Sequence, residues 1–166
     1  MFPYALMGLA ANFLLCQLLM PIIGLKARKM AFTPEFMSQF EQEHKDAMGG
    51  GKPDGIAQPD QGTGWYSRKL PLAQWVRLMS AQRIIFNYIE SFPTMIMFTV
   101  ISSLYFPIPA LVGIWGTLLG RLIFVVGYKK SPPLRKPGMM LIMFCQAMMA
   151  ILSMTTAVMY LSDSMP

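Results

Sequence analysis

Four long apolar stretches, separated by polar segments, dominate the chain. They cover residues 4–25, 84–106, 110–128 and 139–161, and the helices predicted to contain them cover about 4–25, 72–106, 110–128 and 138–161. Each reaches or approaches the roughly 20 residues that an α-helix needs to cross the hydrocarbon core of a membrane. No pattern indicates strands that close into a barrel. The sequence therefore predicts an all-α integral membrane protein, a four-transmembrane-helix bundle that forms a single domain over residues 1–166.

The longest polar segment lies between the first two apolar stretches, at about residues 30–70. Near its start, Thr33, Pro34 and Glu35 have the order of an N-cap, a first-turn proline and an acidic first turn. They predict a short helix at the membrane interface. Residues 49–64 are rich in Gly, Pro, Asp and Gln, which predicts an irregular surface loop.

Positive charge is concentrated in two of the connecting segments. The formal net charge is +6, although 54% of the residues are hydrophobic. The basic residues follow the first and third apolar stretches, so the positive-inside rule places both segments on the cytosol-equivalent side. Membrane lipid is therefore an expected partner, and nucleic acid is not, because no soluble basic domain is present to bind it. The endoplasmic reticulum and a mitochondrial membrane both stay open as locations.

The sequence offers few ligands for a metal. His44 is the single histidine, and Cys16 and Cys145 both lie inside apolar stretches. Cysteines in such surroundings are typical of buried structural thiols rather than of a disulfide or a nucleophile. No metal site is expected.

Three polar side chains lie in the second predicted helix. Arg83, Asn87 and Glu90 are spaced i, i+4, i+7, which places them on one helical face. An arginine and a carboxylate at membrane depth are costly, so they need partners or a water-filled cavity. Two interpretations stay open: a ligand site, or a structural ion pair of Glu90 with Arg83 or Arg121.

A second polar stripe ends the third predicted helix. Arg121, Phe124 and Tyr128 are spaced i, i+3, i+7, and Arg135 follows one short turn later. The short link between the second and third helices predicts antiparallel packing, so the two stripes share a depth. Arginines bind carboxylates and Glu90 binds an ammonium group, which favours a small zwitterion or polyanion as ligand.

The combined spacing resembles the MAPEG superfamily, the membrane-associated proteins in eicosanoid and glutathione metabolism. The elements that carry the resemblance are Arg83-xxx-Asn87-xx-Glu90-xx-Pro93, Gly120-Arg121, Gly127-Tyr128 and Leu134-Arg135. The superfamily includes microsomal glutathione transferases and leukotriene C4 synthase, and also a non-catalytic lipoxygenase-activating protein. The resemblance implies a MAPEG-like bundle that forms a homotrimer or a subunit of a larger membrane assembly.

The resemblance also implies roles for individual residues. Glutathione would be bound as a co-substrate between adjacent subunits, near the cytosolic face. Arg135 would lie near its sulfur, where a guanidinium favours the thiolate. The residues implied in binding glutathione are Arg28, Arg83, Asn87, Glu90, Arg121 and Tyr128.

Three positions depart from the family pattern. Phe124 stands where family transferases commonly have a tyrosine, Ile85 stands where they have glutamine or histidine, and Ser91 stands where leukotriene synthases have a tyrosine. These changes remove hydrogen-bond donors from the pocket but retain its charged frame. The implied function is glutathione binding, either in a transferase or peroxidase for lipophilic electrophiles or in a non-catalytic accessory or scaffold subunit of a membrane complex.

Overall fold

Four long helices dominate the computed structural model, which describes residues 1–56 and 60–164. No strand occurs in these described residues, and the predicted all-α membrane fold is confirmed. Helices of this length and apolar composition make the chain an integral membrane protein whose outer faces contact lipid. The four spans are Phe2–Ala31, Leu72–Tyr105, Pro107–Lys130 and Pro132–Asp163.

The first span consists of three consecutive helical segments. The helix α1 (Phe2–Leu19) passes into the π-helical segment η1 (Met20–Leu25), and α2 (Lys26–Ala31) continues from it. Pro21 lies at the start of η1 and has no backbone N–H to donate, so a wider turn is accommodated there. The other elements are α3 (Pro34–Ser38), α4 (Glu41–Met48), η2 (Ser67–Lys69), α5 (Leu72–Tyr105), α6 (Pro107–Lys130), η3 (Pro132–Arg135) and α7 (Lys136–Ser164).

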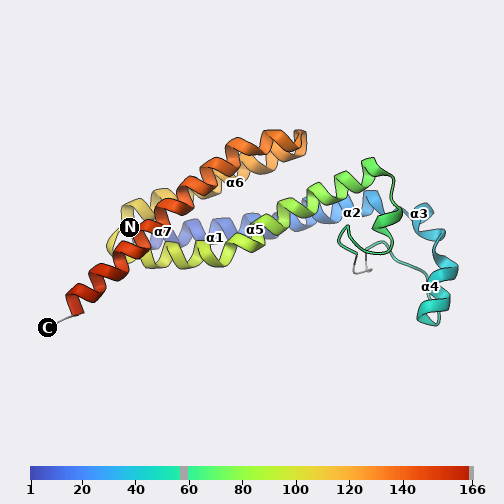
Figure 1. The fold of residues 1–166 in the computed structure, drawn as a ribbon, viewed down its shortest axis with the longest axis horizontal. Helices are drawn as coiled ribbons and strands as arrows, with labels where there is room; N and C mark the ends of the chain where they lie inside the picture. The colour runs from blue at the N-terminus through green and yellow to red at the C-terminus, as the bar shows by residue number, and fades with distance from the viewer. Residues whose placement is uncertain (57–59, 165–166) are drawn as a thin grey trace. The chain divides into compact units, whose positions relative to one another are not determined.

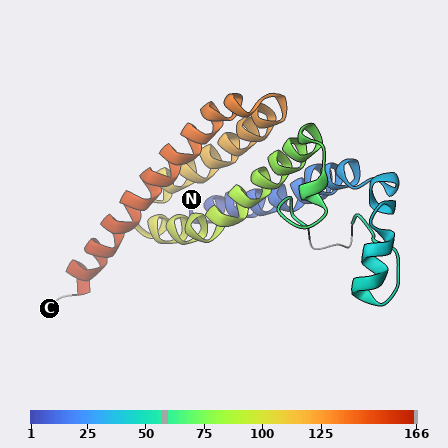
Figure 2. The same cartoon turned by 45° about the vertical axis from the view of Figure 1, so that its right-hand side comes forward.

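The chain divides into two compact units. Unit 1 comprises Met1–Gln17 and Asn87–Pro166, and unit 2 comprises Leu18–Phe86. Within unit 1, α6 and α7 run antiparallel and side by side (Figures 1 and 2). Buried Ala5, Met95 and Ile114 join α1, α5 and α6 in a small apolar core.

Glycines allow α6 and α7 to approach closely. A Cβ atom on Gly138 would lie 2.6 Å from the carbonyl oxygen of Gly120 and 2.6 Å from the Cα of Phe124. No side chain fits at that separation, so the two backbones pack directly against each other, as small residues permit in membrane helices. This packing fixes the part of α6 that carries Arg121 and Phe124.

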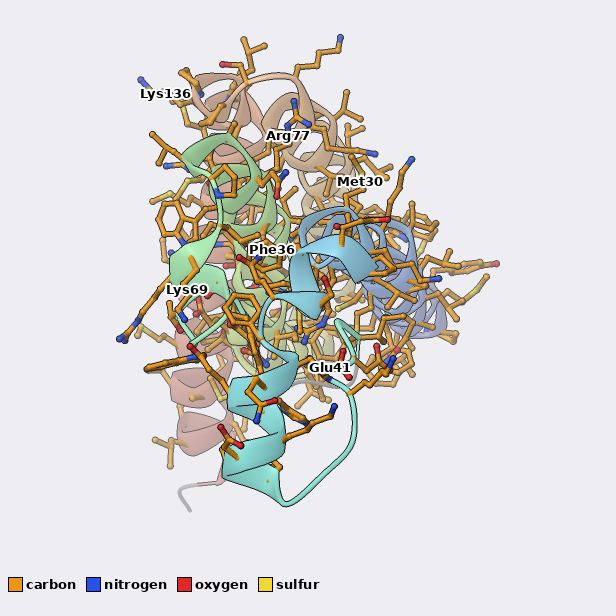
Figure 3. All side chains as sticks on the ribbon, turned by 90° about the vertical axis from the view of Figure 1, so that its right-hand side faces the viewer. Met30, Phe36, Glu41, Lys69, Arg77 and Lys136 are labelled. Carbon is orange, nitrogen blue, oxygen red and sulfur yellow. The ribbon has the colours of Figure 1, made fainter. Side chains whose placement is uncertain are left out.

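Unit 2 folds the polar segment around an aromatic cluster. Thr33 caps α3, because its Oγ1 accepts a hydrogen bond from the backbone nitrogen of Phe36 at 3.2 Å. The predicted N-cap is therefore confirmed. The ring of Phe36 packs edge-on against that of Phe40 at 5.2 Å between centroids. Figure 3 shows Phe36, Glu41 and Lys69 on the part of unit 2 formed by α3, α4 and the segment before α5.

A buried carboxylate organises the irregular part of this segment. Asp60 accepts hydrogen bonds from the backbone nitrogens of Ser67 at 2.7 Å, Gly62 at 2.9 Å and Gly64 at 3.0 Å. Burial alone would raise the pKa of Asp60, but these bonds outweigh it and lower the pKa below its ordinary value. The segment is therefore held by a charged group that stays ionised at neutral pH.

Candidate functional site

The polar stripe of α5 crosses the boundary between the two units. Arg83 belongs to unit 2, whereas Asn87 and Glu90 belong to unit 1. Glu90 lies fifteen residues before the end of α5 at Tyr105, which is about 22 Å along a helix. Since the hydrocarbon core is about 30 Å thick, Glu90 lies at membrane depth if Tyr105 marks one membrane surface.

Arg121 is buried in unit 1, with only 1% of its surface exposed. Its Nη1 donates to Asn87 Oδ1 at 2.6 Å, and its Nη2 donates to Ser91 Oγ. Its guanidinium carbon lies 4.5 Å from the centre of the Tyr88 ring. Within the described residues it takes part in no ion pair, and its Nε has no hydrogen-bond partner. Neutral oxygens and an aromatic face therefore stabilise this cation.

A second buried pair lies behind Arg121, and the sequence interpretation missed it. The Tyr88 hydroxyl lies 2.8 Å from the backbone oxygen of Asn12 and 3.0 Å from its Oδ1. Asn12 Nδ2 in turn donates to the carbonyl oxygen of Gly8 at 2.9 Å. The signal was present, because a lone asparagine in an apolar membrane helix needs buried partners.

The C-terminal end of α6 contributes a separate pair. Arg135 Nη1 donates to the Tyr128 hydroxyl at 2.8 Å, and its guanidinium carbon lies 4.9 Å from the centre of that ring. Buried Phe124 packs against the Tyr128 ring, at 5.5 Å between ring centroids. The hydrogen bond uses one of the five N–H donors of Arg135, so further donors remain on the same group.

Glu90 is exposed on the surface of α5, as is Arg83. Neither takes part in an ion pair among the residues that the structure describes. The interpretation in which Glu90 pairs with Arg121 inside the subunit is therefore wrong, because Arg121 is bound to Asn87 and Ser91 instead. Glu90 thus has no counter-ion within the described part of the single chain, and a carboxylate at membrane depth needs a partner or a water-filled cavity.

Arg28 lies in unit 2 and binds the polar segment of its own chain. Its Nε donates to the carbonyl oxygens of Gly55 at 2.9 Å and Ile56 at 3.2 Å, and its Nη1 donates to that of Asp60. These bonds attach the segment to the end of the first membrane helix. A contact between Arg28 and the glutathione of a neighbouring subunit stays a prediction.

Comparison with known proteins adds one finding. A family model described as the MAPEG family matches residues 6–155. The matched range contains every candidate site residue. It also contains the greater part of each of the four membrane helices. No curated protein and no solved structure matches the chain.

Proposed function

The chain belongs to the MAPEG family, and on that basis we propose that it is a glutathione-binding membrane protein. The observation that carries the proposal is Glu90, a carboxylate exposed on a membrane helix without an ion pair among the described residues. The ammonium group of glutathione would neutralise it where water is scarce and charge pairing is strong.

The neighbouring groups complement the rest of the tripeptide, which carries two carboxylates, peptide carbonyls and a thiol. The oxygen of the Asn87 amide is engaged by Arg121, so its NH₂ group is the end that can donate to a ligand oxygen. Arg83 precedes Asn87 by one helical turn on α5 and supplies a cation. Donors and one carboxylate on a single helix match the charge pattern of glutathione.

We propose that the site lies between copies of the chain in a homotrimer. The exposed Glu90 supports this arrangement, because a second subunit would cover the face that carries it. Glutathione would enter from the cytosol-equivalent side, next to the basic segments. A lipophilic co-substrate would arrive laterally from the bilayer.

Arg135 is the residue that we propose for catalysis. A free thiol has a pKa of about 8.5 and is mostly protonated at neutral pH, and each unit of lowering requires about 1.4 kcal/mol of preference for the anion. A guanidinium beside the sulfur supplies such a preference. The thiolate would attack an electrophilic carbon and form a C–S bond, while the electron pair of the broken bond departs with the leaving group. The bond to Tyr128 holds Arg135 in place for this role.

Binding is tested by titrating the purified protein in detergent with glutathione. Glu90→Gln should weaken binding about thirtyfold or more, because truncating one partner of a desolvated charge pair costs about 2 kcal/mol or more. Glu35→Gln is the matched control, since Glu35 is an exposed carboxylate in α3, outside the membrane helices. Equal affinities for the two variants, or no binding by the unmodified protein, would refute the proposal.

Catalysis is tested by conjugation of glutathione to a lipophilic electrophile. Arg135→Ala should abolish turnover but retain binding, whereas Lys136→Ala, which removes the adjacent exposed cation, should change little. Phe124→Tyr should increase turnover, because it adds a hydroxyl donor beside Tyr128. Turnover that survives Arg135→Ala would contradict the assigned role.

A non-catalytic accessory subunit is the second candidate. Buried Phe124 and Ile85 favour it, because neither side chain can donate a hydrogen bond where family transferases have a donor. This alternative predicts no turnover, even after Phe124→Tyr, and recovery of the protein only as a stoichiometric part of a larger membrane assembly.

A further inference from the structure

A continuous set of buried polar contacts runs through unit 1 from α1 to α6. We propose that Asn12 and Tyr88 are positioning residues, which act through Arg121 on the side chain of Asn87. We call Asn12, Tyr88 and Arg121 the buried brace. The inference rests on the proposed glutathione site, because Asn87, which the brace holds through Arg121, is the residue that would contact glutathione.

The brace determines which end of the Asn87 amide is available. A guanidinium only donates, so the atom 2.6 Å from Arg121 Nη1 must be the amide oxygen. The Asn87 Nδ2 takes part in no hydrogen bond among the described residues, and the side chain is half-buried. While Arg121 stays in place, Asn87 therefore offers two N–H donors to a carbonyl or carboxylate.

The position of Arg121 depends on Tyr88. The guanidinium has no carboxylate to hold it within the described residues and leaves its Nε without a hydrogen-bond partner, so its position depends on Asn87, Ser91 and the Tyr88 ring. The ring lies beneath the guanidinium at 4.5 Å, an arrangement in which the aromatic face attracts the cation. A displaced ring would release one of these restraints.

Asn12 in turn fixes the orientation of the Tyr88 ring. The Tyr88 hydroxyl is bound to both oxygens of Asn12 at 2.8 and 3.0 Å. Asn12 Nδ2 is held by the carbonyl oxygens of Gly8 at 2.9 Å and Ile114 at 3.3 Å. Both residues are fully buried, with 0% of Asn12 and 1% of Tyr88 exposed. They therefore do not contact a ligand directly and can act on it only through Arg121.

The test is a double-mutant cycle on glutathione affinity. Tyr88→Phe keeps the ring but frees it from Asn12, and we expect about a fivefold to tenfold loss of affinity, the equivalent of one weakened hydrogen bond. In an Asn87→Ala background the same substitution should cause no further loss, because the amide that it positions is absent. Thr99→Val is the matched control: it removes a buried hydroxyl of α5 that donates to Met95 rather than to the brace.

A purely structural role gives a different result. Tyr88→Phe and Thr99→Val would then weaken binding equally, or Tyr88→Phe would weaken it as much in the Asn87→Ala background as in the unmodified protein. Either outcome overturns the inference.

A second measurement does not depend on glutathione. The buried brace predicts that Asn12→Ala and Arg121→Met are coupled although the two residues share no contact, so the double variant should shift the thermal midpoint by less than the sum of the single shifts. If the protein binds no glutathione, the proposed function fails, and this cycle alone tests whether Asn12 and Arg121 are coupled through the buried brace. Additive shifts would overturn it.

Discussion

Removing the charge of Arg121 and removing its acceptor Asn87 should have unequal effects on stability. A buried ion loses several kcal/mol of hydration, and Arg121 has no carboxylate among the described residues to offset this loss. Its two hydrogen bonds to side chains contribute about 1.5–3 kcal/mol each, and the contact with the Tyr88 ring about 2 kcal/mol. The favourable and unfavourable contributions are therefore of similar size.

Arg121→Met removes both contributions together, so the free energy of unfolding should change by no more than about 1–2 kcal/mol. Asn87→Leu instead leaves the guanidinium buried with one acceptor fewer and should cost about 3–5 kcal/mol. The double variant should resemble Arg121→Met alone, because the acceptor has no function once the charge is gone.

The assay is equilibrium unfolding in detergent, followed by the fluorescence of the three tryptophans. Two results would contradict this prediction: Asn87→Leu destabilises no more than Arg121→Met, or the double variant shows the sum of the two single effects. Either result would mean that the Asn87 contact does not compensate the buried charge.

Three further predictions concern packing, pH and topology. Gly138→Ala should destabilise by about 1–3 kcal/mol, since its Cβ would meet backbone, whereas Gly116→Ala meets only the end of a cysteine side chain; equal midpoints in thermal unfolding would contradict this. Because the pKa of Asp60 is lowered in the folded protein, ionised Asp60 stabilises the fold fully above its ordinary pKa of 3.8. This stabilisation is lost as pH falls through the lower pKa of the folded state. Hydrogen-exchange protection of the polar segment should therefore persist from neutral pH to about pH 4 and fall below it, and Asp60→Asn should remove this pH dependence. Lysine reagents added from the cytosol-equivalent side should label Lys45 and Lys130 together; labelling of the two from opposite sides would contradict the topology.

The membrane helices were predictable because the signals that define them are local. An apolar run of sufficient length specifies a span whatever its neighbours are, and the helix α5 begins at Leu72, the expected start. The capping of α3 by Thr33 depends on only three successive residues and a nearby N–H.

The partners of the polar residues were less predictable, because they depend on how helices rotate and pack. Sequence spacing placed Asn87 and Glu90 on one face of α5, yet only Asn87 meets Arg121, which lies 34 residues further along the chain. The bonds of Arg28 to the polar segment likewise join residues far apart in sequence. Asn12 was detectable as a single amide in an apolar helix, but its link to Tyr88 required the structure.

Binding of glutathione at Glu90 is tested most directly by whether glutathione protects this carboxylate from chemical modification. A hydrophobic carbodiimide modifies carboxyl groups in membrane helices, and the rates at Glu90 and Glu35 can be followed by mass spectrometry in the same sample of unmodified protein. Both side chains are exposed in the single chain, so Glu35 serves as the internal control. We predict that glutathione slows modification of Glu90 in a saturable manner and leaves Glu35 unchanged. Equal rates at Glu90 with and without glutathione would contradict the assignment of the site.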